Sequence, residues 1–277
     1  MNRLRNIFLA PSVAVTVALF LVPLTIIVAY SFLTRGVYGG VTGPWTLENY
    51  RRLFDPLYGL ILLRSLWMST ASTILCLLIA FPLALFIARA DPRRKSLFLY
   101  LVILPFWTSF LVRTYAWMFL LRDSGLINSL LLSLGLISEP LPLLYNETAV
   151  IVGLVYGYLP FAVLPLFSNL DRLDKHLLEA AADLGATPFQ SFRHIILPLC
   201  APGLRAAAVL VFIPCLGAYL TPDLLGGGKS IMIGNLIQNQ FTTARDWPFG
   251  AAISLAMMAL IMILLLGLIR RDGEAVL

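Results

Sequence analysis

The chain has 277 residues, of which 60% are hydrophobic and 12% are charged, and its mean hydropathy is +0.89. A soluble protein of this length needs many more polar side chains at its surface, with about 25% of its residues charged. The composition therefore excludes a soluble enzyme, a disordered chain and a small disulfide-linked scaffold. It indicates an integral membrane protein, and the net charge of +6 does not require a nucleic acid partner.

Long apolar segments recur along the chain and predict six membrane-spanning helices. A helix needs about 20 mostly apolar residues to cross a bilayer. Four of the segments contain no charged residue, one carries Arg113 within it, and one runs from Arg205 almost to Asp223. We expect an all-α membrane protein, a six-helix bundle with spans at residues 8–33, 65–88, 97–121, 149–169, 204–222 and 249–269.

Two further apolar segments, 124–138 and 230–244, are shorter than a span. Counting either one as a span would reverse the orientation of every later helix, which the distribution of charge opposes. We predict that both are interfacial or re-entrant segments.

The orientation follows from the Lys and Arg residues near the ends of the spans. With the N-terminus inside, the inner segments hold twelve of the 20 Lys and Arg residues and the outer segments hold seven. We therefore expect a multi-pass protein of the bacterial inner membrane with both termini in the cytoplasm. The expected parts are an N-terminal span with its outer loop (1–60), a transmembrane domain (61–270) containing a cytoplasmic loop (171–203), and a cytoplasmic tail (271–277).

The cytoplasmic loop at 171–203 has the sequence features of two short helices joined by a turn. Asp174 can cap the first helix, and Gly185 stands where a helix ends in a left-handed residue. Thr187 can cap the second helix, with Pro188 at its first position and Gln190 completing a capping box. We expect Pro198 to break this second helix just before the fifth span.

The same loop carries the pattern E-A-A-x3-G-x9-I-x-L-P, in which every fixed position is matched. It resembles the signature of permease subunits of binding-protein-dependent ABC importers. The resemblance implies that the loop is a coupling helix that docks on an ATPase subunit. The residues that match the signature are Glu179, Ala180, Ala181, Gly185, Ile195, Leu197 and Pro198.

Other stretches resemble one branch of that family, the spermidine/putrescine permeases, and most closely their first membrane subunit. The resemblance is carried by four stretches: residues 31–35, 104–117, 173–186 and 226–252. It implies half of a translocation pathway for polyamines, and three kinds of partner: an ABC ATPase dimer, a second permease subunit and a periplasmic solute-binding protein.

The chain lacks a convincing nucleotide site of its own. The one phosphate-loop-like string, from Asp223 to Ser230, has an aspartate in place of the first glycine and is predicted to face outside. We therefore expect no catalytic residue, no metal and no bound cofactor, with ATP and magnesium on the partner ATPase. His176 and His194 have no neighbouring metal-ligand cluster in the sequence.

Polar and aromatic residues within the spans are the candidates for a solute pathway. Asp223 could attract a cation, and Arg113 either reaches outward to anchor its helix or faces the bundle and bonds to a partner helix. Aromatic rings could add cation–π contacts: Trp107, Tyr115, Trp117, Tyr156, Tyr158 and Tyr219.

Two other functions remain open from the sequence. The same class of importer could carry another small cation or an opine-like or amino-acid-like solute. A stand-alone secondary transporter is a further possibility, which would require paired carboxylates in the membrane or an inverted repeat.

Overall fold

The structure, a computed structural model, describes residues 2–228 and 230–274. The backbone forms two compact units, which are described separately below. The first comprises Met1–Leu60 with Leu236–Leu277, and the second comprises Ile61–Asn235. The described residues are mostly helical, and their strands form a single small hairpin, β1 (Thr34–Arg35) with β2 (Val41–Thr42).

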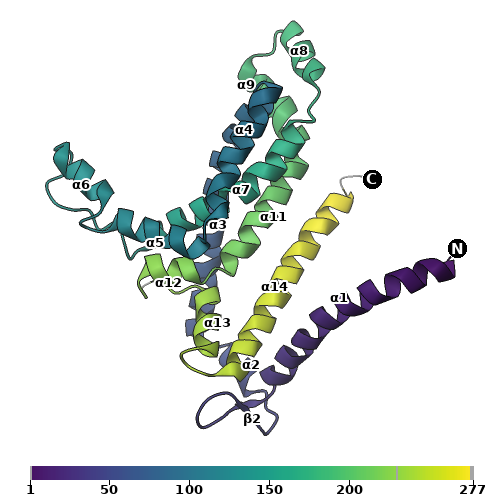
Figure 1. The fold of residues 1–277 in the computed structure, drawn as a ribbon, viewed down its shortest axis with the longest axis vertical. Coiled ribbons are helices and arrows are strands. Elements are labelled where there is room, and N and C mark those ends of the chain that lie inside the picture. Colours follow the sequence, from purple (N-terminus) through teal and green to yellow (C-terminus); the bar gives the residue numbers. More distant parts are fainter. Residues whose placement is uncertain (1, 229, 275–277) are drawn as a thin grey trace. The chain divides into compact units, whose positions relative to one another are not determined.

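The second unit is a bundle of apolar helices with short helices at its two ends (Figure 1). Two helices, α3 and α13, run on into the first unit. In chain order its helices are α3 (Pro56–Arg89), α4 (Pro92–Ile103), the 3₁₀ helix η1 (Leu104–Trp107), α5 (Phe110–Leu121), α6 (Leu126–Ser133), α7 (Glu147–Leu170), α8 (Lys175–Asp183), α9 (Pro188–Ser191), the π-helix η2 (Phe192–Ile196), α10 (Leu197–Leu199), α11 (Ala201–Leu216), α12 (Leu220–Gly226) and α13 (Ile233–Phe241).

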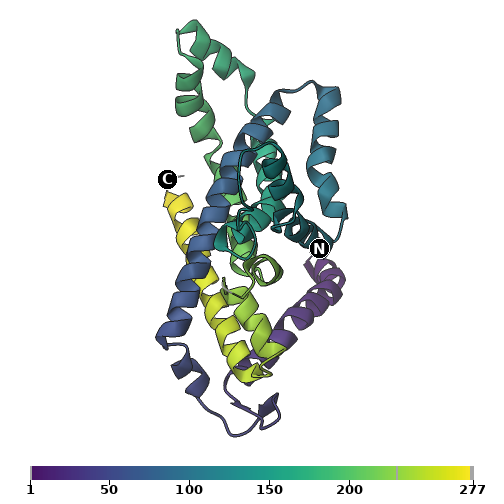
Figure 2. The same cartoon turned by 90° about the vertical axis from the view of Figure 1, so that its left-hand side faces the viewer.

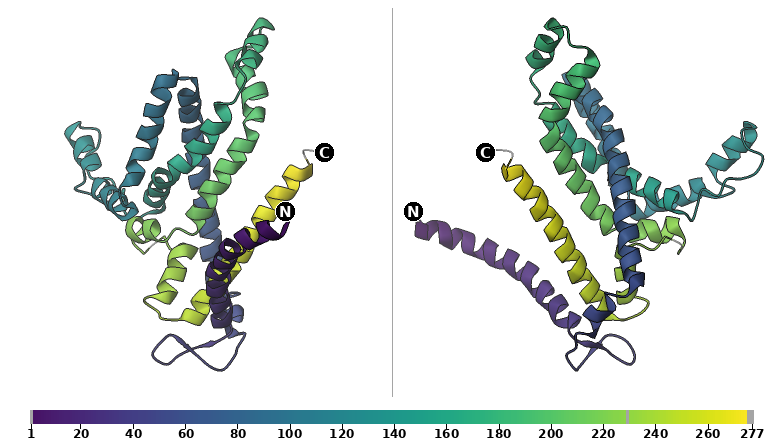
Figure 3. Two further views of the ribbon diagram at one scale, coloured as in Figure 1. Left: turned by 45° about the vertical axis from the view of Figure 1, so that its right-hand side comes forward. Right: turned by 180° about the vertical axis from the view of Figure 1, so that it is seen from behind.

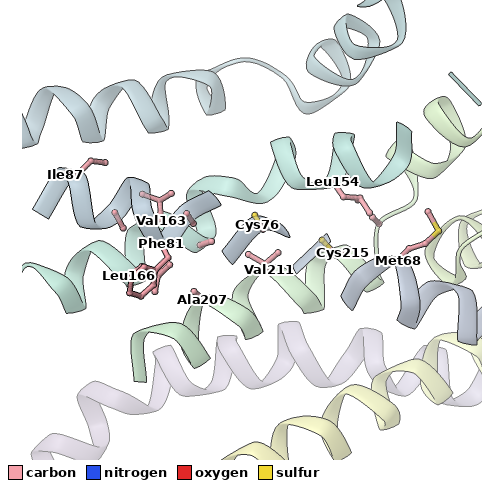
Figure 4. Packing of buried hydrophobic residues seen from close by; sticks show 14 of the residues in the cluster. Met68, Cys76, Phe81, Ile87, Leu154, Val163, Leu166, Ala207, Val211 and Cys215 are labelled. Carbon is pink, nitrogen blue, oxygen red and sulfur yellow. The ribbon is translucent and has the colours of Figure 1, made fainter. Parts of the chain in front are cut away.

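The core of this unit lies where α3, α7 and α11 meet (Figure 4). Cys76, Leu154 and Val211, one from each helix, are fully buried there. The helices approach closely because small residues face the contact: a Cβ added at Gly203 of α11 would lie 2.7 Å from the Cβ of Asn169 on α7. This tight packing makes α7 the central helix of the unit.

Ion pairs tie both ends of α7 to neighbouring helices. At its first turn, the Oε1 atom of Glu147 lies 2.7 Å from the Nε atom of Arg64 on α3. At its last turn, Asp171 accepts a hydrogen bond from the ammonium group of Lys95 on α4. These side chains remain partly exposed, so each pair contributes at most about 1 kcal/mol. Their main effect is to set the register of α7.

The first unit pairs α1 (Asn2–Ser31) with α14 (Trp247–Glu274). The two helices lie close beside the hairpin and separate towards the chain termini (Figure 3). The short helix α2 (Glu48–Arg52) closes this end of the unit. Its Asn49 is buried and donates hydrogen bonds to the carbonyl oxygens of Ser31 and Leu33. These carbonyls lie at and beyond the C-terminal end of α1, where no further helical N–H is available to them.

Four of the six predicted spans are confirmed as long, continuous apolar helices. They are α1, α3, α7 and α14, whose most apolar windows have mean hydropathies between 2.1 and 2.6. The most apolar window of α1 carries no residue buried within the chain. Its apolar side chains therefore suit contact with lipid rather than with a protein core.

The third predicted span, 97–121, is wrong as a single continuous helix. The chain bends by 89° between Pro92–Trp107 and Phe110–Ser133. Thr108 and Ser109 adopt extended conformations at the bend, and the Thr108 hydroxyl donates a hydrogen bond to the carbonyl of Pro105. The uninterrupted apolar composition conceals this break, because hydropathy does not report the backbone angles of two small polar residues.

The fifth predicted span, 204–222, is also corrected. Its helix α11 ends at Leu216, and the chain then turns through Gly217 before α12 begins at Leu220. Pro214 stands just before this end and weakens the last turn of the helix because it removes a backbone donor.

The predicted break between the second loop helix and the fifth span is present, but it lies two residues after Pro198. The helix widens into η2 and continues to Leu199, and the 65° bend lies at Cys200. Because Pro198 has no N–H, the carbonyl of His194 lacks its usual α-helical donor. In the same segment the Leu197 N–H donates a hydrogen bond to the carbonyl of Phe192, five residues earlier, as in a π-helix.

The two shorter apolar segments form α6 and α13, of eight and nine residues. Both helices are too short to cross a bilayer, in agreement with their exclusion from the spans. The six predicted spans therefore correspond to four long helices and two bent pairs.

Candidate functional site

The 171–203 loop forms a helical hairpin that projects past the ends of α3 and α4 (Figure 2). Its two N-terminal caps and its glycine turn lie where the sequence predicts. The Oδ1 atom of Asp174 accepts a hydrogen bond from the His176 N–H, and Gly185 adopts a left-handed φ of +81°. Thr187 and Gln190 form the expected capping box. Local sequence thus determines the fold of this loop almost completely.

The turn at Gly185 presents apolar side chains to the surroundings. Leu184 is 89% exposed and Phe189 is 68% exposed. Glu179 and Ala180 are also exposed, and His176 Nδ1 lies 3.1 Å from Glu179 Oε2. An isolated membrane protein does not benefit from such an apolar tip, so the turn has the character of a contact surface.

The other signature residues differ in how far they are buried. Ala181 is buried, Ile195 is half-buried, and Leu197 and Pro198 are exposed. In η2 the ring of Phe192 meets Phe81 of α3 edge-on, with centroids 5.6 Å apart. This contact connects the loop directly to the core of the second unit.

A second candidate site is a cavity of about 580 Å³ beside the middle of α7, where η1, α5 and α7 meet the turn between α11 and α12. Four aromatic rings in its wall contact one another in sequence: Phe106 with Phe161, Phe161 with Tyr158, and Tyr158 with Phe110, with centroids 5.4, 6.1 and 6.3 Å apart. We call this group the aromatic box. It gives the cavity a rigid, electron-rich wall.

Arg113 lines the same cavity and lies against the aromatic box. Its Cζ atom lies 4.4 Å from the ring centre of Phe106 and 5.5 Å from that of Phe110. Its Nε and Nη1 atoms are buried and have no hydrogen-bond partner among the described residues. Arg113 therefore faces the bundle, but its buried atoms are held by ring faces rather than by polar groups of a partner helix.

The structure divides the predicted pathway residues into three groups. Arg113, Tyr158 and Tyr219 line the cavity. Trp117 and Tyr156 pack edge-on against each other, with centroids 5.5 Å apart, away from it. The remaining three do not line it: Trp107, Tyr115 and Asp223.

Among the cavity residues that the sequence did not single out as pathway candidates, three are aromatic: Phe106, Phe110 and Phe161. Spacing gives a signal for two of them, since Phe110 stands three residues before Arg113 and Phe161 three after Tyr158, which places side chains on one helical face. The string from Asp223 to Ser230 begins inside α12 and continues through left-handed glycines, while its Lys229 lies outside the described residues.

Residues 80–271 match the family described as binding-protein-dependent transport system inner membrane component. The spermidine/putrescine transport system permease protein PotB of Haemophilus influenzae is 43% identical over 95% of this chain and 92% of its own length. PotB of Escherichia coli K12 is 46% identical over 88% of this chain and 89% of its own.

The fold agrees with this match. A bacterial ABC transporter involved in the import of the acidic polysaccharide alginate aligns with a TM-score of 0.75, covering 98% of this chain and 96% of its own, at 18% identity. The predicted fold, an ABC importer permease with six spans, is confirmed. The chain is a multi-pass transport component, and it belongs to the family of inner-membrane components of binding-protein-dependent transport systems.

Proposed function

We propose that this chain is one permease subunit of an ATP-driven importer that carries polyamines, such as spermidine and putrescine, into the bacterial cytoplasm. The observation that carries the proposal is the 43–46% identity to spermidine/putrescine permeases, which extends over nearly all of the chain. The matched lengths, 95% and 88% of this chain, are long enough to include both the cavity wall and the 171–203 loop.

The 171–203 loop is the proposed docking site for the ATPase. Its support is the exposed apolar tip at Leu184 and Phe189, together with the carboxylate of Glu179 beside it. An apolar tip with a polar rim is typical of a surface that is covered by a partner. Because Phe192 of the loop packs against Phe81 of α3, a movement of the docked loop would be transmitted directly to α3.

The remaining partners and the orientation belong to the same proposal. The loop and both termini lie in the cytoplasm, a second permease subunit completes the pathway, and a solute-binding protein delivers the solute outside. ATP and magnesium bind to the ATPase, and this chain hydrolyses nothing. A second permease subunit is required because a single set of six spans supplies only half of a closed pathway.

One observation favours a second candidate solute. Arg113 is the one charged residue among the described residues that line the cavity, and a buried guanidinium usually pairs with a carboxylate. A solute that carries a carboxylate, such as an opine or an amino-acid derivative, would supply that partner. The two candidates differ in the role that they give to Arg113.

The docking claim is tested by purifying the permease and measuring how much ATPase remains bound. Replacing the exposed Leu184 with serine should reduce the bound ATPase at least several-fold. Leu134→Ser is a matched control, because Leu134 also follows a short helix and is 69% exposed, yet lies outside the loop. Equal retention of the ATPase by the two variants would refute the docking site.

The solute claim is tested by expressing the permease with its ATPase, second permease and binding protein in a bacterium that lacks polyamine uptake. Uptake of radiolabelled spermidine or putrescine supports the proposal. Uptake of a carboxylate-bearing solute without any polyamine uptake would favour the second candidate instead.

A further inference from the structure

We infer that Arg113 is a built-in cation that occupies the aromatic box and so prevents a passing polyamine from binding there tightly. The inference rests on the proposed function, because it assumes that the solute carries ammonium groups. It assigns the cavity as a weak ammonium site whose strength is set by a residue of the permease itself.

The wall of the cavity has the chemistry to attract a cation. The cavity is lined by five aromatic side chains, Tyr219 and the four rings of the aromatic box, and its described lining contains no carboxylate. A cation within about 6 Å of a ring centre is attracted by the face of the ring. Without Arg113, the faces of Phe106 and Phe110 that it now covers would therefore be open to an alkylammonium group.

The rings cannot easily move out of the way. The Tyr158 hydroxyl donates a hydrogen bond to the Pro214 carbonyl at 3.3 Å, which fixes that ring against α11. Phe110 is confined by α7, since a Cβ at Gly157 would lie 3.0 Å from its Cε2 atom. A fixed wall binds a cation better than a mobile one, because little side-chain freedom is lost on binding.

Arg113 already stands where an ammonium group would bind. Its guanidinium carbon lies 4.4 Å from the ring centre of Phe106, within the range of a cation–π contact. The guanidinium is held in place because its Nε and Nη1 atoms are enclosed by the chain. An incoming ammonium group thus meets a ring face that is already occupied and a like charge beside it.

This arrangement suits an importer. A permease receives its solute from a binding protein and must release it, so a site that held polyamine tightly would slow every cycle. A fixed positive charge in the wall lowers the affinity of the cavity without removing the rings. The polyamine can pass along the aromatic wall, but the charge of Arg113 prevents it from binding there tightly.

The test is equilibrium binding of radiolabelled spermidine to the purified permease–ATPase complex in the absence of the binding protein. Arg113→Met removes the charge and keeps much of the volume. It should lower the Kd for spermidine at least about tenfold. Two like charges about 4 Å apart in a partly desolvated site repel by more than that factor in binding. Arg113→Lys keeps the charge and should bind spermidine as weakly as the original protein.

Two further measurements separate this role from a structural one. The double variant R113M/F161L should lose the gained affinity, because it removes one ring of the exposed wall. In uptake assays R113M should lower the maximal rate while the amount of bound ATPase is unchanged. If R113M does not insert into the membrane, Arg113→Gln is measured in its place with the same expectation.

The inference is overturned if R113M binds spermidine no more tightly than the original protein, or if R113K behaves like R113M. These outcomes differ from failure of the proposed function. If the unaltered complex imports no polyamine, the proposed solute is wrong whatever the variants do. If it imports polyamine and the Kd of R113M is unchanged, only the role of Arg113 is wrong.

Discussion

The guanidinium of Arg52 on α2 lies 2.8 Å from the carboxylate of Asp246, which stands immediately before α14, and packs 3.9 Å from the ring centre of Phe249. The Asp246 side chain is almost fully buried and also accepts a hydrogen bond from the Phe249 N–H, capping α14. Burial disfavours the charged form of Arg52, but its hydrogen bonds and charge interactions with Asp246 and Tyr58 together outweigh this and raise the pKa of Arg52. This pair closes the hairpin end of the first unit.

Replacing Asp246 with alanine should destabilise the first unit by about 2 kcal/mol, because it removes a cap and leaves a partly buried cation without its partner. Asp55→Ala is the matched control: Asp55 also caps the following helix, through the Leu57 N–H, but its side chain is exposed. It should cost about 1 kcal/mol or less. Thermal unfolding in detergent measures both, and equal losses would contradict a special role for the buried pair.

The raised pKa of Arg52 determines how this effect depends on pH. A group whose pKa is higher in the folded state contributes stability below its unfolded pKa and loses it only above that value. For an arginine that loss lies far above neutral pH. The difference in unfolding temperature between the original protein and D246A should therefore stay constant from pH 7 to pH 9, and a decline over this range would contradict the assignment.

The turn at Gly185 offers a sharp test of the docking loop. Gly185 and Gly135 end their helices in the same way, each with a positive φ and the same pair of capping hydrogen bonds, and neither would meet another atom if a Cβ were added. A valine at either position should cost about 1–2 kcal/mol of local backbone strain. Only Gly185→Val should reduce ATPase binding and uptake, and equal effects of Gly135→Val would show general damage instead.

Gly157 tests whether the shape of the aromatic box matters for transport. An alanine here favours the helix by up to about 1 kcal/mol, yet its Cβ would press on Phe110. We expect Gly157→Ala to reduce polyamine uptake several-fold without lowering thermal stability. Gly267→Ala, at an exposed helical glycine of α14 with open space around it, should leave uptake unchanged. Normal uptake by G157A would show that the box can rearrange freely.

The sequence predicts local features of this fold better than its bends. Helix caps depend on a few adjacent residues, so Asp174, Gly185 and Thr187 could be placed correctly from the sequence alone. The long spans follow from apolar length. The bends at Thr108 and Cys200 do not, because each depends on how a few backbone groups find hydrogen-bond partners.

The cavity was predictable only in part. Arg113, Tyr158 and Tyr219 stand out because charged and hydroxylated residues are rare in spans, and the structure brings them to one cavity. Phenylalanines are common in any membrane helix, so Phe106 and Phe161 carry no such signal. They line the cavity because the chain breaks after η1, where Phe106 contacts Phe161 of α7. Hydropathy does not reveal this break.

The central claim is that this permease moves polyamines only when the 171–203 loop transmits the action of an ATPase. The most direct measurement is uptake of radiolabelled spermidine by proteoliposomes that contain the full complex, with its binding protein supplied on the outer side. We expect uptake that requires enclosed ATP and is reduced at least several-fold by Leu184→Ser but not by Leu134→Ser. Spermidine uptake that continues without ATP, or that Leu184→Ser leaves intact, would contradict it.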